Sequence, residues 1–135
     1  MNKLEKLKDL LLTGALLSEN TFTIDDVDFI LDSRDKDIFD SEWMRNYNLI
    51  RKNEKLDTPE VKKIVEFIRE ISYKVAYKAS QSSELASYIS DDFGLIAEAL
   101  IIDYNDDWVN ALANEYMEGR VPYNDLKPLK GELAK

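Results

Sequence analysis

Apolar residues recur along most of the chain at intervals of three and four, the spacing that places side chains on one face of an α-helix. The first run predicts an amphipathic helix over about residues 2–17, which Gly14 weakens near its end. Thr23 is the expected N-cap of a second helix, with carboxylates in its first turn. The polar stretch 33–40 predicts a loop, after which Asp40 or Ser41 is expected to cap a third helix.

The clearest start signal is Thr58-Pro59-Glu60, which offers an N-cap, a proline at the first helical position and an acid in the first turn. Five apolar residues then step by three and four, namely Val61, Ile64, Ile68, Ile71 and Val75. This pattern predicts a helix over about residues 59–79, which we expect at the centre of the core.

Ser82 or Ser83 is expected to cap the next helix, which continues to about residue 102 unless the chain breaks near residue 90. Asn105 or Asp106 opens a last helix, and Gly119 is a natural stop. Prolines at 122 and 128 then exclude a long helix. The sequence therefore predicts an all-α, single-domain bundle of five or six helices over 1–120, with an extended C-terminal tail, 121–135, packing partly on it.

The residue inventory removes many kinds of chemistry. With no Cys and no His, the chain has neither thiolate ligands nor the commonest general base and transition-metal ligand. Glycines are scattered rather than gathered in a phosphate loop. The segment 103–107 begins like a calcium loop, but Trp108 stands where that loop needs glycine. A carboxylate pair could still perform acid–base chemistry, yet nothing marks one as buried, so we predict no enzyme, no metal and no cofactor.

Location and nucleic-acid binding are judged from the same inventory. No apolar run approaches the roughly 18 residues of a membrane span, and Glu5 and Asp9 interrupt the one N-terminal run that superficially suggests a signal peptide. We therefore expect a cytoplasmic protein without membrane contact. The most basic segment, residues 51–78, has a net charge of only +3, so nucleic acid is not an expected partner.

The net charge of −9 is unevenly distributed along the chain. Residues 79–119 hold nine acids and no base, and residues 25–42 hold eight acids against Arg34 and Lys36. On one continuous helix, Glu84, Asp91 and Glu98 repeat every seven residues and would form an outer acidic stripe. A second group lies in the following turn around Tyr104. The predicted partner-binding residues are Glu84, Tyr88, Asp91, Glu98, Asp103, Tyr104, Asp106 and Asp107.

Two plainer interpretations of this charge remain open: it is a solvated face, or the basic helix 59–79 neutralises it from within. The leading functional hypothesis is a small acidic protein-binding module. It would be an immunity or antitoxin-type inhibitor of a basic, nuclease-type toxin, with Tyr104 as a surface anchor, whereas Trp108 and Tyr116 are expected in the core. A DNA-mimic antagonist of a restriction or CRISPR effector is the alternative, and a helical adaptor without inhibitory role is the third. Abundant Lys, Asn and Ile suggest a bacterial or phage source.

Overall fold

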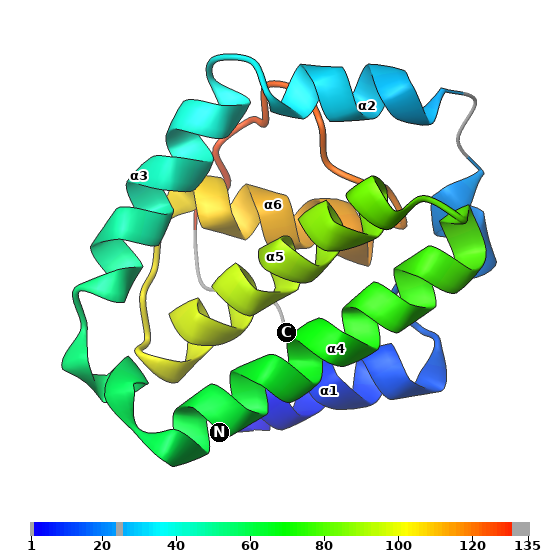
Figure 1. The fold of residues 1–135 in the computed structure, drawn as a ribbon. Coiled ribbons are helices and arrows are strands. Elements are labelled where there is room, and N and C mark those ends of the chain that lie inside the picture. Colours follow the sequence, from blue (N-terminus) through cyan, green and yellow to red (C-terminus); the bar gives the residue numbers. More distant parts are fainter. Residues whose placement is uncertain (1, 24–25, 131–135) are drawn as a thin grey trace.

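Six α-helices and two short 3-10 helices (η) form the secondary structure of residues 2–23 and 26–130, the part that the computed structural model describes (Figure 1). In order, they are α1 (Asn2–Thr13), η1 (Glu19–Phe22), α2 (Val27–Arg34), α3 (Phe39–Arg51), η2 (Glu54–Asp57), α4 (Pro59–Ser80), α5 (Ser83–Ile101) and α6 (Asp107–Met117). There is no strand among these residues. The predicted all-α bundle is confirmed.

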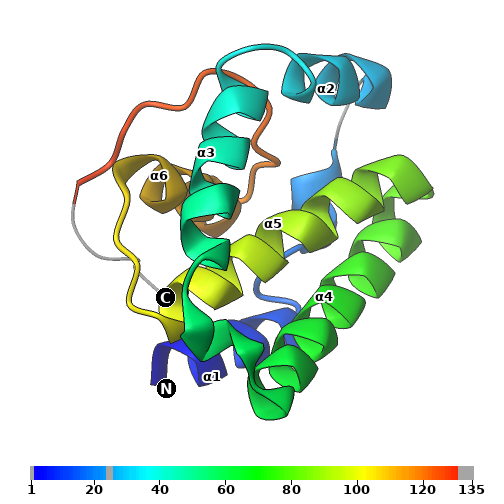
Figure 2. The same ribbon diagram turned by 60° about the vertical axis from the view of Figure 1, so that its left-hand side comes forward.

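Helix α5 is the centre of the molecule. It packs against α1, α2, α3, α4 and α6, and Figures 1 and 2 show α4 running beside it in the opposite direction. Between Leu85 and Ala99 most side chains are buried, as expected for a helix that neighbouring elements cover over most of its surface. The prediction that helix 59–79 lies at the centre was therefore wrong. Helix α4 lies at the outside, where Phe67 and Tyr77 are exposed.

Helix α5 does not break near residue 90. The residues that suggested a break, Ser90 and Gly94, instead contact α4. The Ser90 hydroxyl donates a hydrogen bond to the Arg69 carbonyl of α4 (2.8 Å) instead of capping a new helix. Gly94 leaves room for the Arg69 side chain, since a Cβ at that position would lie 2.9 Å from Arg69 Cδ. Helix α5 is therefore continuous, with a close approach to α4 at Gly94.

Three predicted helix starts are confirmed by their caps. The Thr58 and Ser82 hydroxyls accept hydrogen bonds from the backbone amides of Val61 and Leu85, both at 3.2 Å. The Asp106 carboxylate accepts from the amides of residues 108 and 109, at 2.9 and 3.2 Å. These caps satisfy amides that a helix leaves without partners at its first turn.

The N-terminal third differs from the prediction at its boundaries. Helix α1 ends at Thr13, because Gly14 takes a positive φ of 83° that turns the chain out of the helix. Thr23 follows η1, and the cap of α2 is Asp26, whose carboxylate accepts from the Phe29 amide at 3.1 Å. Asp25, expected in that first turn, lies outside the described residues.

The predicted loop 33–40 is shorter in the structure. Residues 33 and 34 complete α2, while α3 begins at Phe39. Neither Asp40 nor Ser41 caps α3; the capping position is Ile38, at a positive φ of 73° and without a side-chain hydrogen bond. The α2–α3 connection is thus a tight turn of residues 35–38.

The described part of the C-terminal tail, residues 121–130, contacts the helices. Val121 and Leu126 are buried, and the Leu129 amide donates to the Asp107 carbonyl at the start of α6 (3.0 Å). Residues 131–135 lie outside the described part. The division of the chain at residue 120 stays a prediction.

Candidate functional site

Two of the three carboxylates in the expected acidic stripe on α5 pair with arginines of neighbouring helices, and one of these two is buried. Glu98 is only 8% exposed and lies 2.6 Å from Nη1 of Arg51, at the end of α3. Burial raises the pKa of Glu98, and the nearby Arg51 guanidinium opposes that shift. The prediction that Glu98 faces outward was therefore wrong, because α3 and α4 pack over that face of α5.

Asp91, one heptad earlier, pairs with Arg69 of α4 at 2.6 Å. Burial raises the pKa of Asp91, and the Arg69 charge opposes this. Of the stripe, only Glu84 is classed as exposed and forms no ion pair within the described residues. One of the two plainer interpretations was that the basic helix 59–79 neutralises the acidic segment from within. It is correct for Asp91, which pairs with Arg69 of α4.

In the turn after α5, some of the predicted partner-binding residues also have partners within the molecule and others are exposed. The Tyr104 hydroxyl donates to Asn46 Oδ1 of α3 (2.7 Å), so this ring is not the surface residue that its acidic neighbours suggested. Asp106 caps α6 and also pairs with Arg45 of α3 at 3.1 Å. Asp103 is exposed and Asp107 is half-buried in the first turn of α6.

Tyr88 connects α5 to the second acidic cluster. Its hydroxyl donates to Asp35 Oδ1 in the α2–α3 turn (2.7 Å). That hydrogen bond, with burial and the negative charge of Asp35, raises the pKa of Tyr88 to about 12. Around this contact lie four exposed carboxylates that form no ion pair in the described structure, here called the acidic corner: Asp35, Asp37, Asp40 and Glu84.

A hollow of about 180 Å³ opens beside the acidic corner, between α3 and α5. We call it the aromatic hollow, and its lining residues are Arg34, Asp35, Phe39, Asp40, Trp43, Met44, Tyr88 and Asp91. A second hollow of similar volume adjoins it at Trp43 and Asp91 and extends toward Tyr47 and Glu98. Trp43 and Tyr47 stack with ring centroids 5.5 Å apart, which gives this face of α3 an aromatic surface.

A buried ion pair lies beneath the aromatic hollow. Arg34, the last residue of α2, donates two hydrogen bonds to Asp92 of α5, with Nη1–Oδ2 at 2.9 Å and Nη2–Oδ1 at 2.6 Å. Neither side chain reaches solvent to any extent, at 5% and 0% exposed. Burial lowers the pKa of Arg34, but the charge and hydrogen bonds of Asp92 outweigh it and leave that pKa above its usual value.

Three further groups complete this network. Trp43 Nε1 donates to Asp92 Oδ1 (2.9 Å), and the Tyr116 hydroxyl of α6 donates to Oδ2 (2.6 Å). The Pro122 carbonyl of the tail accepts from Arg34 Nη1 (3.2 Å). Burial and the Asp92 charge raise the pKa of Tyr116 well above its ordinary value. Side chains of α2, α3 and α6 therefore meet at the Asp92 carboxylate of α5, whose buried charge is matched by its partners, and the tail is joined to the network through Arg34.

Sequence reasoning missed this network, although one signal for it was present. Asp92 lies three residues after Ile89 and four before Ile96, which places it on the apolar face of α5. A carboxylate at such a position needs a buried partner. Arg34, one of only two bases among residues 25–42, was the natural candidate.

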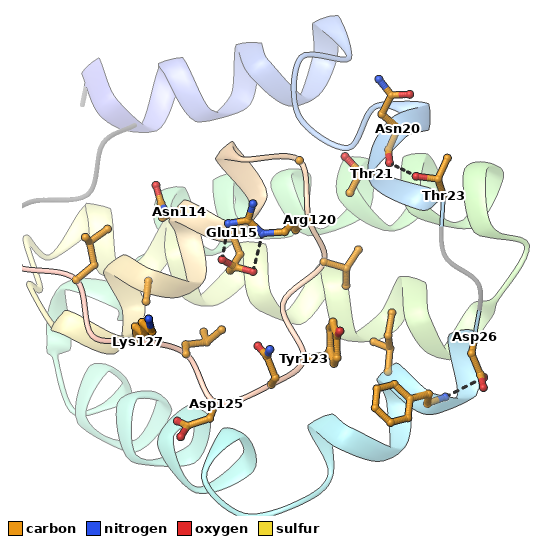
Figure 3. Close-up of a pocket in the computed structure, with 18 of the residues that line it drawn as sticks. Asn20, Thr21, Thr23, Asp26, Asn114, Glu115, Arg120, Tyr123, Asp125 and Lys127 are labelled. Carbon is orange, nitrogen blue, oxygen red and sulfur yellow. Dashed lines mark hydrogen bonds and ion pairs between the residues drawn. The ribbon is translucent and has the colours of Figure 1, made fainter.

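A larger pocket, of about 980 Å³, lies elsewhere, between η1, α2, α6 and the tail (Figure 3). Its charges are mostly satisfied internally: Arg120 pairs with Glu115 at 2.9 Å, and Asp26 caps α2. Figure 3 shows these contacts along its wall. None of the predicted partner-binding residues lines it. In the described residues there is no metal-binding group of three or more acidic side chains, and no helix has the length and apolar character of a membrane span.

Comparison with known families decides the class of protein. The family model described as Immunity protein PIM1 matches residues 6–123. The chain belongs to this family. The PIM1 match runs from α1 to the first residues of the tail, and so includes every helix that contributes to the Arg34–Asp92 network. No curated protein matches the chain.

Membership of the PIM1 immunity family confirms the immunity-type part of the functional hypothesis. Such a protein has a toxin as its partner, so this PIM1 family member functions by binding another protein. The aromatic hollow and the acidic corner lie within the matched residues.

Proposed function

We propose that this chain inhibits a basic, nucleic-acid-acting toxin by binding it directly through the acidic corner and the adjoining aromatic face of α3. The observation that carries this proposal is the set of exposed, unpaired carboxylates at Asp35, Asp37, Asp40 and Glu84, beside a surface with exposed Met44 and Tyr47. Nuclease-type toxins bind a polyanion and have cationic active sites, to which such a surface is complementary.

The positions of the predicted partner-binding residues in the structure narrow the proposed interface. Glu84 and Tyr88 adjoin the acidic corner, and Asp91 lines the hollow beside it. Glu98, Tyr104 and Asp106 have partners within the molecule, and we no longer place them in the interface. A DNA mimic needs a continuous array of exposed carboxylates, so the burial of Glu98 favours the toxin inhibitor over that alternative.

The proposal is tested by affinity capture from the native host, followed by reconstitution. The purified chain is expected to capture a basic protein at low salt and less of it at high salt, because salt screens charge. The captured protein, purified alone, should cleave or modify nucleic acid, and an equimolar amount of the chain should stop it. A captured toxin that does not act on nucleic acid would reject the nuclease part of the proposal.

A charge-reversal pair isolates the acidic corner. Asp37→Lys with Glu84→Lys is expected to slow association with that toxin by about tenfold at low salt, because like charge repels the partner before contact. Glu54→Lys with Glu66→Lys makes the same charge change at two exposed positions on η2 and α4 and serves as the control. Equal effects of the two pairs would show that only net charge matters.

A further inference from the structure

We propose that the aromatic hollow receives an arginine side chain of the toxin, as the anchor of the interface. This inference rests on the proposed function and specifies the chemistry of the partner at one position. The hollow measures about 180 Å³, less than the roughly 300–1,000 Å³ of a small-molecule pocket, so it fits one side chain rather than a cofactor.

The charge of the hollow selects a cation. Four charged residues line it, and two of them are neutralised by partners: Arg34 by buried Asp92, and Asp91 by Arg69. The other two, Asp35 and Asp40, are exposed and form no ion pair within the described residues. The hollow therefore has two uncompensated negative charges, which attract a basic side chain and repel an acidic one.

The walls of the hollow favour arginine over lysine. The guanidinium carbon of Arg34 lies 4.5 Å from the Phe39 ring centroid and 5.2 Å from that of Tyr88, so a guanidinium is already accommodated against these rings. Phe39 is buried, whereas Tyr88 is half-buried and is the ring available to a partner's guanidinium. A planar guanidinium can also fork between two carboxylates, which the compact ammonium of lysine does less well. Aromatic walls with two carboxylates at the rim are therefore matched to arginine.

The surroundings supply the water-excluding rim that a buried anchor needs. Met44 and Tyr47 expose 41% and 37% of their surface on the α3 face. The adjoining hollow is electrically neutral, because its two arginines pair with Glu98 and Asp91. A partner that covers this apolar and neutral area would desolvate the arginine contact, which is the usual arrangement around an interface hot spot.

The hollow is first tested without any toxin, by ¹H–¹⁵N NMR titration with N-acetyl-arginine amide. The chain has two tryptophans, Trp43 in the hollow and Trp108 in the core, so their indole N–H signals report on the two places separately. The Trp43 signal should shift and the Trp108 signal should not. N-acetyl-citrulline amide, similar in shape but uncharged, should bind about tenfold more weakly. Equal binding of the two probes would overturn the proposal.

Matched variants connect the hollow to its carboxylates. Asp35→Asn with Asp40→Asn should abolish the Trp43 shift, and the amide at position 35 can still accept the Tyr88 hydrogen bond. Asp28→Asn with Asp32→Asn removes the same charge from exposed positions of α2 that do not line the hollow. If this control pair reduces the shift as much, the hollow is not the site.

The captured toxin separates the two proposals. The Asp35/Asp40 pair should weaken the complex at least about tenfold, as expected for an anchor, and the Asp28/Asp32 pair less than about threefold. If both pairs weaken it equally, the inhibitor role stands and the arginine anchor fails. If the wild-type chain binds no nucleic-acid-acting toxin, the proposed function fails, and the result with the arginine amide still decides whether the hollow binds the side chain.

Discussion

Arg34 and Asp92 are 58 residues apart in the sequence and form a bidentate ion pair in the core, with hydrogen bonds of 2.9 and 2.6 Å. Arg34 is the last residue of α2, and the next residue, Asp35, begins the acidic corner. The pair therefore fixes the α2–α3 turn against α5, and with it the carboxylates that the proposed interface uses. Preorganisation of this kind lowers the ordering cost of binding.

Removal of the Asp92 charge is expected to be strongly destabilising. Asp92→Asn leaves the Arg34 guanidinium buried without a counter-charge, a change that typically lowers the free energy of unfolding by about 3–5 kcal/mol. Urea denaturation measures the loss. Asp91→Asn at the neighbouring residue removes a pair whose side chains are 50% and 43% exposed, and should cost less than about 1 kcal/mol. Similar losses for the two variants would contradict a special role for the buried pair.

The cap of α6 provides a second test of stability. Asp106→Ala removes hydrogen bonds to two backbone amides and the contact with Arg45, so we expect a loss of about 1–2 kcal/mol. Asp107→Ala at the next position removes only a carboxylate near the helix end, worth about 0.3–1 kcal/mol. Thermal unfolding of the two variants side by side distinguishes them. A larger loss for Asp107→Ala would be incompatible with Asp106 as the cap.

What the sequence predicted well depends on local chemistry. The caps at Thr58, Ser82 and Asp106 need only a side chain and amides two or three residues ahead, so the residue pattern is sufficient. The start of α3 has no such signal, because Ile38 at the capping position offers no side-chain hydrogen bond. Its boundary was accordingly predicted wrongly.

The candidate site could be predicted only in part, because a charge is compensated by neighbours in space. The heptad spacing correctly placed Glu84, Asp91 and Glu98 on one side of α5, but it could not reveal that arginines of α3 and α4 pair with two of them. The acidic neighbours of Tyr104 suggested that it is exposed, but its hydroxyl donates a hydrogen bond to Asn46 of α3. Conversely, Asp35 and Tyr88 meet only through the tertiary fold.

Gln81, between α4 and α5, occupies a backbone conformation that glycine favours. It is the C-cap of α4 at φ 60° and ψ 21°, in the left-handed region where a Cβ is strained. We expect Gln81→Gly to raise the free energy of unfolding by about 1 kcal/mol relative to Gln81→Ala, which keeps the strain. Both variants lose the side-chain hydrogen bond to the Lys78 carbonyl, so the difference isolates the backbone. Equal stabilities in urea would argue against strain at this position.

The Glu98–Arg51 pair gives the stability of the fold a defined pH dependence. Burial raises the pKa of Glu98 in the folded state above its ordinary value of 4.5. Between pH 4.5 and that raised pKa, the folded state therefore holds a proton on Glu98 that the unfolded state has lost. Stability contributed by this group therefore falls as the pH rises above 4.5, and is constant once Glu98 is ionised in both states. The sign is opposite to that of a carboxylate whose ion pair outweighs its burial.

Glu98→Gln removes this titration and should become more stable relative to the wild type as the pH rises through that window, measured by urea denaturation at a series of pH values. Arg51→Gln should act in the other direction, because loss of the guanidinium raises the pKa of Glu98 further and widens the window. If Glu98→Gln instead loses relative stability with rising pH, the attraction of Arg51 exceeds the cost of burial. The pair would then stabilise the α3–α5 contact at neutral pH. It would not be a destabilising burial of charge that the surrounding apolar packing offsets.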